Sequence, residues 1–200
     1  MAIKFQYNKT SLQDMSKQLH VRMRALPTLK NKESALRVEV KKARDEAASF
    51  DERIQNKIQS YEEMARLWKE FDPTLIAIAG VDLSVKKIAG VKTPVLDEIQ
   101  FKTKEFSLFN QPSWFMDGIN ILKEVATLGI EREFFIRKMR LLDRARKKTT
   151  QKVNLYEKVQ IPGYEDAIRK IKRFMEDEDN LSKSSQKIVK DRLEKTAAVS

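Results

Sequence analysis

Few residues in this 200-residue chain have the types and spacing that chemistry requires. The chain has no cysteine and one histidine, His20, which excludes thiol nucleophiles, disulfides and cysteine-based metal sites. The stretch AGVKTP at 89–94 comes nearest to a phosphate-binding loop, but it lacks the second glycine beside the lysine. The proline after Thr93 also opposes the helix whose N terminus would hold the phosphate, so we expect no nucleotide site.

The acidic run EDED at 176–179 is the best candidate for a cation site. Consecutive carboxylates on a helix point in different directions, and the run lacks the glycine of a calcium-binding loop. His20 has no second histidine with which to complete a site, so it is expected to be a solvated helix residue. We therefore expect no catalytic residue, no metal and no cofactor, and predict that the chain is not itself an enzyme.

Positive charge is the remaining feature that could bind a partner. The net charge is +11, distributed as +5 in residues 1–70, −1 in 71–130 and +7 in 131–200. The stretch 137–152 holds eight cations and one aspartate; the cations are Arg137, Lys138, Arg140, Arg144, Arg146, Lys147, Lys148 and Lys152. Such a stretch is a solvated helix face, a surface for an acidic protein, or a nucleic-acid site. No aromatic residues are interleaved with the cations, which weakens the case for single-stranded nucleic acid.

The elements that would position these cations are helices. The first 68 residues carry core-type residues with a mean spacing of 3.5, which predicts a long coiled-coil seam. Pro27 implies either a kink or a later helix start, and EFDPT at 70–74 predicts an end near Phe71. The seam positions are Leu12, Met15, Leu19, Met23, Leu26, Leu29, Glu33, Leu36, Val40, Ala43, Ala47, Phe50, Ile54, Ile58, Tyr61, Ala65 and Trp68.

A second helical pattern of nearly equal length begins after residue 130, with candidate core positions that continue to Leu181, Ile188 and Leu193. Two matched helices favour an antiparallel hairpin, in which facing residue numbers should sum to about 200. Between them, β-leaning runs separated by VKTP predict a short β-hairpin at about 84–106. A short helix is expected at about 114–129, ending at Gly129.

The predicted fold class is mainly α: a long antiparallel two-helix coiled coil from the N- and C-terminal segments, with a small middle segment containing the β-hairpin and the short helix. The predicted domains are 1–71 (N-terminal coiled-coil helix), 72–130 (middle segment) and 131–200 (C-terminal coiled-coil helix). The start MAIKFQYNKT has no apolar signal region, and no run is long enough to span a bilayer. We expect a cytoplasmic chain without direct membrane insertion.

One pair of residues conflicts with this helical pattern. Pro162 stands inside the second helix and is followed by Gly163. A proline in a helix interior removes a backbone donor and costs about 3 kcal/mol. We interpret the pair as a structural bend, or alternatively as a tolerated kink without a mechanical role.

Four segments, in order, resemble a known family. Near the C terminus, the chain resembles a signature of the D subunit, which is the central rotor stalk of V-type and A-type rotary ATPases. The signature reads Val-Asn…Glu-x-Val-x-Ile-Pro…Ile, and its residues here are Val153-Asn154, Glu157, Val159, Ile161-Pro162, Ile168 and Ile171. IAGVKTPVL at 88–96 is similar to the family's Ala-Gly-Val-x-x-Pro motif. LKNKESAL at 29–36 and ILKEVATLG at 121–129 resemble its N-terminal motif and its short helix.

The resemblance implies a non-catalytic shaft that links ATP hydrolysis or synthesis to proton or sodium transport. Its implied partners are a hexamer of catalytic and regulatory ATPase subunits, the companion F subunit of the stalk and a membrane-rotor adaptor subunit, with no nucleic acid. The chain would be peripheral to the membrane through this complex. An alternative is a basic coiled-coil nucleic-acid-binding protein. The gamma shaft of F-type synthases is disfavoured, because the middle segment is too short for that family's larger α/β domain.

Overall fold

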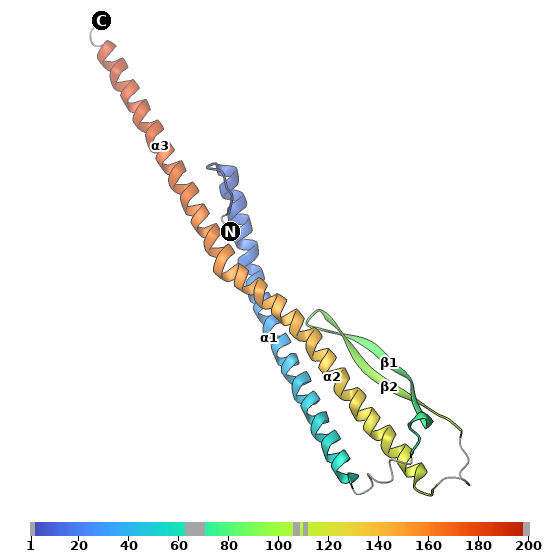
Figure 1. The fold of residues 1–200 in the computed structure, drawn as a ribbon. Helices are drawn as coiled ribbons and strands as arrows, with labels where there is room; N and C mark the ends of the chain where they lie inside the picture. Colours follow the sequence, from blue (N-terminus) through green and yellow to red (C-terminus); the bar gives the residue numbers. More distant parts are fainter. Residues whose placement is uncertain (1–2, 63–70, 106–108, 110–111, 198–200) are drawn as a thin grey trace. The chain divides into compact units, whose positions relative to one another are not determined.

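The described residues are mainly α-helical and contain one β-hairpin, which confirms the predicted fold class (Figure 1). The computed structural model describes residues 3–62, 71–105, 109 and 112–197. Contacts divide the chain into two compact units, one formed by Met1–Asn31 with Thr149–Ser200 and the other by Lys32–Lys148. Within the described ranges, no helix is long and apolar enough to cross a membrane.

Helix α1 (Lys9–Ser60) carries much of the predicted seam, but the predicted core positions Met23 and Ile58 are 49% and 58% exposed, so the prediction is wrong there. Its buried residues follow the coiled-coil spacing and are Leu36, Val40, Ala43, Ala47 and Phe50. The helix passes through Pro27 without ending, so the prediction of a later start is wrong. The predicted end near Phe71 is also wrong, because α1 ends at Ser60. Seam positions Ala65 and Trp68 lie outside the described residues.

Two helical segments pair antiparallel within each unit. In the larger unit Asp51 forms an ion pair with Arg132, and Phe50 stacks on Phe135 with ring centroids 5.5 Å apart. In the unit that contains the termini, Arg22 donates to Gln160. These contacts join residues whose numbers sum to between 182 and 185.

The predicted sum of about 200 is therefore wrong. That estimate assumed helices that meet near residues 70 and 131. Helix α1 instead ends at Ser60, and the helix that pairs with it begins at Phe115, so every facing pair shifts to lower numbers.

The β-hairpin consists of β1 (Ile76–Ile88) and β2 (Val91–Thr103), which form a two-stranded antiparallel sheet. The residues between them, Ala89 and Gly90, have φ angles of 47° and 77°. Positive φ at both central residues is the geometry of a type I′ turn, which matches the twist of the strands. The hairpin was predicted too short, at 84–106, because this two-residue turn was not recognised.

The stretch VKTP, predicted to separate the strands, is instead the start of β2. Pro94 lies opposite Val85 in the register. A two-stranded sheet tolerates a proline because half of its backbone N–H groups point away from the partner strand. Among the described residues, both outer edges of this sheet lack a partner strand, and β1 exposes Ile78, Leu83 and Val85 at 52%, 54% and 67%.

Helix α2 (Phe115–Leu155) begins where the short helix was expected, but it does not end at Gly129. A glycine in a helix interior costs only about 1 kcal/mol, which the packing on either side of it can offset. The start of α2 packs into a small apolar core made by Phe71, Leu75, Phe115 and Ile119. The prediction of a separate short helix is therefore wrong.

A turn of π-helix, η5 (Tyr156–Gln160), follows α2, and α3 (Ile161–Ala197) follows η5. In this turn the backbone N–H of Ile161 donates to the carbonyl of Tyr156, five residues earlier. The wide turn directly precedes Pro162, whose ring would crowd the carbonyl four residues earlier in a regular α-helix. The proline is thus accommodated by a local change in helix type.

Candidate functional site

Five of the eight predicted cations share one side of α2. On an ideal helix they fall within an arc of about 100°. All five side chains are exposed. We call this surface the basic face; its residues are Arg137, Arg140, Arg144, Lys147 and Lys148.

The basic face points away from the core because the opposite side of α2 is buried. Leu142 is fully buried and forms a core cluster with Leu36 and Val40 of α1. Met139 and Ala145 pack against the same cluster. This packing fixes the rotation of α2 within the larger unit and leaves the basic face directed to solvent.

The other three predicted cations do not belong to the basic face. The ammonium of Lys138 lies 5.4 Å from the ring centroid of Phe135, and Arg146 is bonded to Asp143 with its side chain only 26% exposed. Lys152 is exposed further along α2, in the unit that contains the termini. Of the eight cations predicted from the sequence, five thus form one surface.

Two members of the basic face are partly neutralised. Arg137 bonds Glu133 at 2.9 Å, and this hydrogen bond holds the pKa of Glu133 below its usual value. Hydrogen bonds from Arg146, and then from Lys147, lower the pKa of Asp143. Both carboxylates therefore stay ionised at neutral pH. The other three, Arg140, Arg144 and Lys148, form no ion pair within the described residues.

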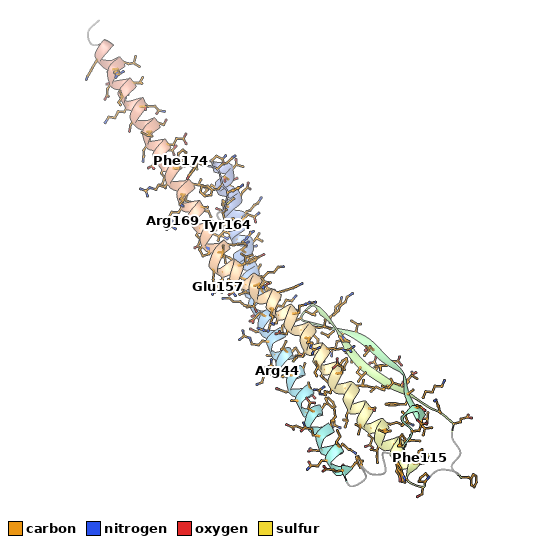
Figure 2. All side chains as sticks on the ribbon, viewed as in Figure 1. Arg44, Phe115, Glu157, Tyr164, Arg169 and Phe174 are labelled. Carbon is orange, nitrogen blue, oxygen red and sulfur yellow. The ribbon has the colours of Figure 1, made fainter. Side chains whose placement is uncertain are left out.

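Pro162 and Gly163 lie at the start of α3, directly after the π turn. A Cβ added at Gly163 would come within 2.9 Å of Cδ1 of Ile3, so the glycine makes room for the N-terminal segment. That segment continues along α3, where Tyr7 and Phe174 pack with ring centroids 4.8 Å apart (Figure 2).

The far part of α3 is a second candidate surface. Every residue from Glu176 to Lys195 is exposed. Four large apolar side chains lie within an arc of about 140° on this part of the helix. We call them the apolar stripe: Leu181, Ile188, Val189 and Leu193, exposed by 70%, 53%, 56% and 66%. Three of these residues were predicted to be core positions, and that prediction is wrong.

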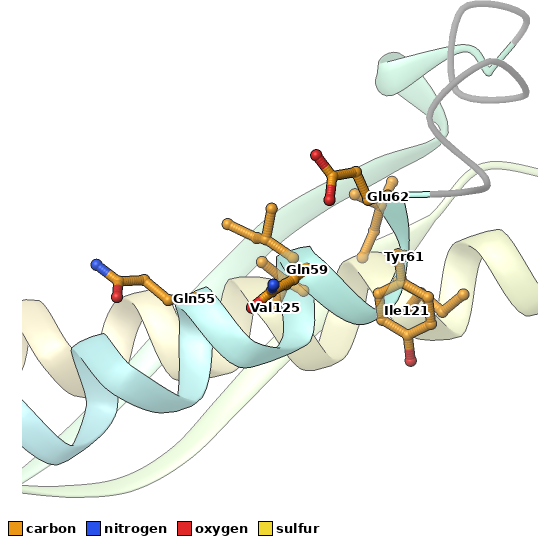
Figure 3. Close-up of a pocket in the computed structure, with 8 residues that line it drawn as sticks. Gln55, Gln59, Tyr61, Glu62, Ile121 and Val125 are labelled. Atoms are coloured by element: carbon orange, nitrogen blue, oxygen red, sulfur yellow. The ribbon is translucent and has the colours of Figure 1, made fainter.

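An apolar pocket of about 580 Å³ lies between the end of α1 and the start of α2 (Figure 3). Its walls come mainly from Ile58, Ile121, Leu122 and Val125, and its one carboxylate is Glu62. No group of three or more metal-binding side chains occurs in the described part of the chain.

Comparison with known proteins identifies the class of protein to which the chain belongs. A family model that describes the D subunit of ATP synthase matches residues 11–191. The D subunit of the V-type ATP synthase of Borreliella burgdorferi is 30% identical over 192 residues, covering 95% of each chain. The protein of the same name from Chlamydia muridarum is 27% identical over 199 residues, covering 97% of this chain and 98% of its own.

These matches place the chain among the subunits of ATP synthases. The chain belongs to the family of ATP synthase D subunits. This membership confirms the resemblance that was seen in the four sequence segments.

Proposed function

We propose that this chain is the central-stalk rotor subunit of a V-type or A-type rotary ATPase. It mechanically couples ATP hydrolysis or synthesis in the catalytic hexamer to proton or sodium transport through the membrane ring. The chain itself does no covalent chemistry, because ATP is bound by its partners. Family membership and the four matching sequence segments support this proposal.

The apolar stripe is the observation that carries the proposal. A helix that exposes large apolar residues over twenty consecutive positions gains little stability from its own chain. Contiguous exposed apolar residues on a soluble protein mark an interaction surface. In the proposed shaft, the stripe contacts the surrounding hexamer of catalytic and regulatory ATPase subunits.

The basic face supports a second set of contacts. Three of its cations have no ion pair among the described residues and repel each other weakly, and an acidic partner surface would offset that repulsion. We propose that Arg137, Arg140, Arg144, Lys147 and Lys148 contact an acidic rim of the hexamer or the companion F subunit of the stalk. Lys138 and Arg146, also predicted to contact partners, would lie beside this surface, and we propose that Lys152, further along α2, contacts partners as well.

The remaining partner is a membrane-rotor adaptor subunit at the end of the chain's helical hairpin. This arrangement would keep the chain cytoplasmic and peripheral to the membrane, without inserting into it. Pro162 and Gly163, after the π turn, would give the shaft a fixed bend, so that it presents different faces to the three nucleotide sites.

Co-expression with the catalytic and regulatory ATPase subunits tests the proposal. The parent chain should co-purify with them in a stoichiometric complex. The double variant Leu181→Glu, Ile188→Glu should lose most of this complex, because burying a carboxylate in an apolar interface is unfavourable.

A matched control adds the same charge outside the apolar stripe on the same helix. Asn180→Glu with Ser184→Glu alters two exposed polar positions of α3 and should leave the complex intact. The stripe is not the contact surface if both double variants assemble equally well. Failure of the parent chain to form any complex with these subunits would refute the proposed function.

A further inference from the structure

One arginine on α1 contacts both ends of the π turn. The guanidinium Nε of Arg22 donates to Oε1 of Gln160, the last residue of η5, at 2.6 Å. The guanidinium carbon lies 5.8 Å from the ring centroid of Tyr156, the first residue of η5. It also lies 4.6 Å from the ring of Tyr164, just beyond Pro162-Gly163 (Figure 2).

The guanidinium is itself held in place from its own helix. Its Nη1 donates to the backbone carbonyl of Gln18 at 3.0 Å and to the side-chain oxygen of the same residue at 2.5 Å. The side chain of Arg22 is half-buried by these contacts. A planar, multiply bonded guanidinium has little freedom to move, so it can fix the position of the groups it touches.

Other contacts at this turn are weaker. Lys30 and Glu157 form an ion pair at 2.7 Å, but their side chains are 48% and 45% exposed. Exposed pairs of this kind contribute little to stability, because water and salt screen them. Arg22 therefore contacts more residues of this turn than Lys30 does, two against one.

The π turn needs such a restraint because it competes with the ordinary α-helix. A π turn holds one residue more than the α-helical register allows. If the turn changed to regular α-helix, the following helix would have to rotate by about 100° relative to the preceding one. The groups that hold the π turn thus set the rotational register of α3.

We propose that Arg22 is a positioning residue that holds η5 in the π form and thereby fixes the rotation of α3 after Pro162. The guanidinium joins the first residue of the turn, its last residue and the next turn of α3 to α1. This inference does not depend on the proposed function, because it concerns contacts within one chain.

Amide hydrogen exchange of the full-length chain tests this role. Arg22→Gln should speed the exchange of amides at 158–164 by about tenfold, since it removes a charge-assisted hydrogen bond and the contact with Tyr164. Gln160→Leu, which removes the acceptor and keeps Arg22, should speed exchange at the same amides. The amides of 139–145, in the other unit, should be unaffected by either variant.

The matched control is Arg24→Gln, an exposed arginine two residues along the same helix. The proposal is overturned if Arg22→Gln leaves exchange at 158–164 unchanged, or if Arg24→Gln raises it equally. Arg22→Gln and Gln160→Leu break the same hydrogen bond. In the double variant, the increase in exchange rate at 158–164 should therefore be smaller than the increases of the two single variants combined. Fully additive effects would also overturn the proposal.

Discussion

At the scale of single residues, Leu141 and Leu142 are adjacent in sequence and opposite in environment. Leu142 is fully buried against Leu36 and Val40, whereas Leu141 is 45% exposed. Leu142→Ala should lower the free energy of unfolding by about 2–5 kcal/mol, because it removes buried methyl groups and leaves a cavity. Chemical denaturation followed by circular dichroism would measure the change.

Leu141→Ala is the matched control for that measurement. The same atoms are removed one position along the same helix, so helix propensity is changed equally. The expected effect is about 0.5 kcal/mol or less, as is usual for exposed positions. Equal effects of the two substitutions would mean that the assigned rotation of α2 is wrong.

Much of the basic face could be read from the sequence, since the spacing of its cations is helical. The role of Arg22 could not be read in the same way. Its partners Gln160 and Tyr164 are more than 130 residues away in the sequence. Nothing in the local pattern around Arg22 indicates which face of the second helical stretch it meets.

At the scale of elements, Gly129 shows why an element boundary was misplaced. A glycine after an apolar helical run is a common C-cap signal, but α2 continues through this position. A Cβ added at Gly129 would have no atom within 4 Å. Gly129→Ala should therefore raise the free energy of unfolding by about 0.5–1 kcal/mol, because alanine loses less backbone entropy in a helix. Thermal or chemical unfolding would measure this.

Gly118 in the same helix provides the control. A Cβ there would lie 3.1 Å from the ring of Trp114 and 3.3 Å from Phe71. Gly118→Ala should gain less stability than Gly129→Ala or lose some, because the crowding offsets the propensity gain. A larger gain at Gly118 would contradict the described packing.

The helices themselves were predictable because their apolar spacing persists over many turns. Their ends were not, since proline and glycine signals depend on tertiary context: Pro27 lies inside α1, and Gly129 lies inside α2. The predicted pairing of the two helices, with facing residue numbers that sum to about 200, was wrong for the same reason, because it was calculated from the expected helix ends. The division at residues 71 and 130 into three domains stays a prediction.

At the scale of the whole molecule, the net charge of +11 and the basic face predict assembly that depends on salt. Reversing Arg144, Lys147 and Lys148 to Glu should weaken binding to the ATPase subunits by about tenfold to a hundredfold at low ionic strength. The loss should shrink as salt is added, because added ions screen exposed charges. Binding measured over a series of salt concentrations would show this.

The control reverses three cations on α1 in the same unit: Arg37, Lys41 and Arg44 (Figure 2). One member of each triplet has an acidic partner four residues earlier, Glu33 for Arg37 and Asp143 for Lys147. Equal weakening by both triplets would indicate a general effect of net charge rather than a specific surface. DNA affinity of the parent chain that falls steeply with salt would instead favour the nucleic-acid alternative.

The free edge of β1 has a consequence for the colloidal behaviour of the isolated chain. The backbone groups on this outer edge have no partner strand among the described residues. Together with the exposed side chains of Ile78, Leu83 and Val85, they form a template to which another extended strand can pair. Lys86 and Lys87 at the end of the strand place like charges against one another whenever two copies approach edge to edge. The solubility of chains that have not assembled with partners therefore depends on these lysines. High salt screens their charges and favours aggregation of the unassembled chains.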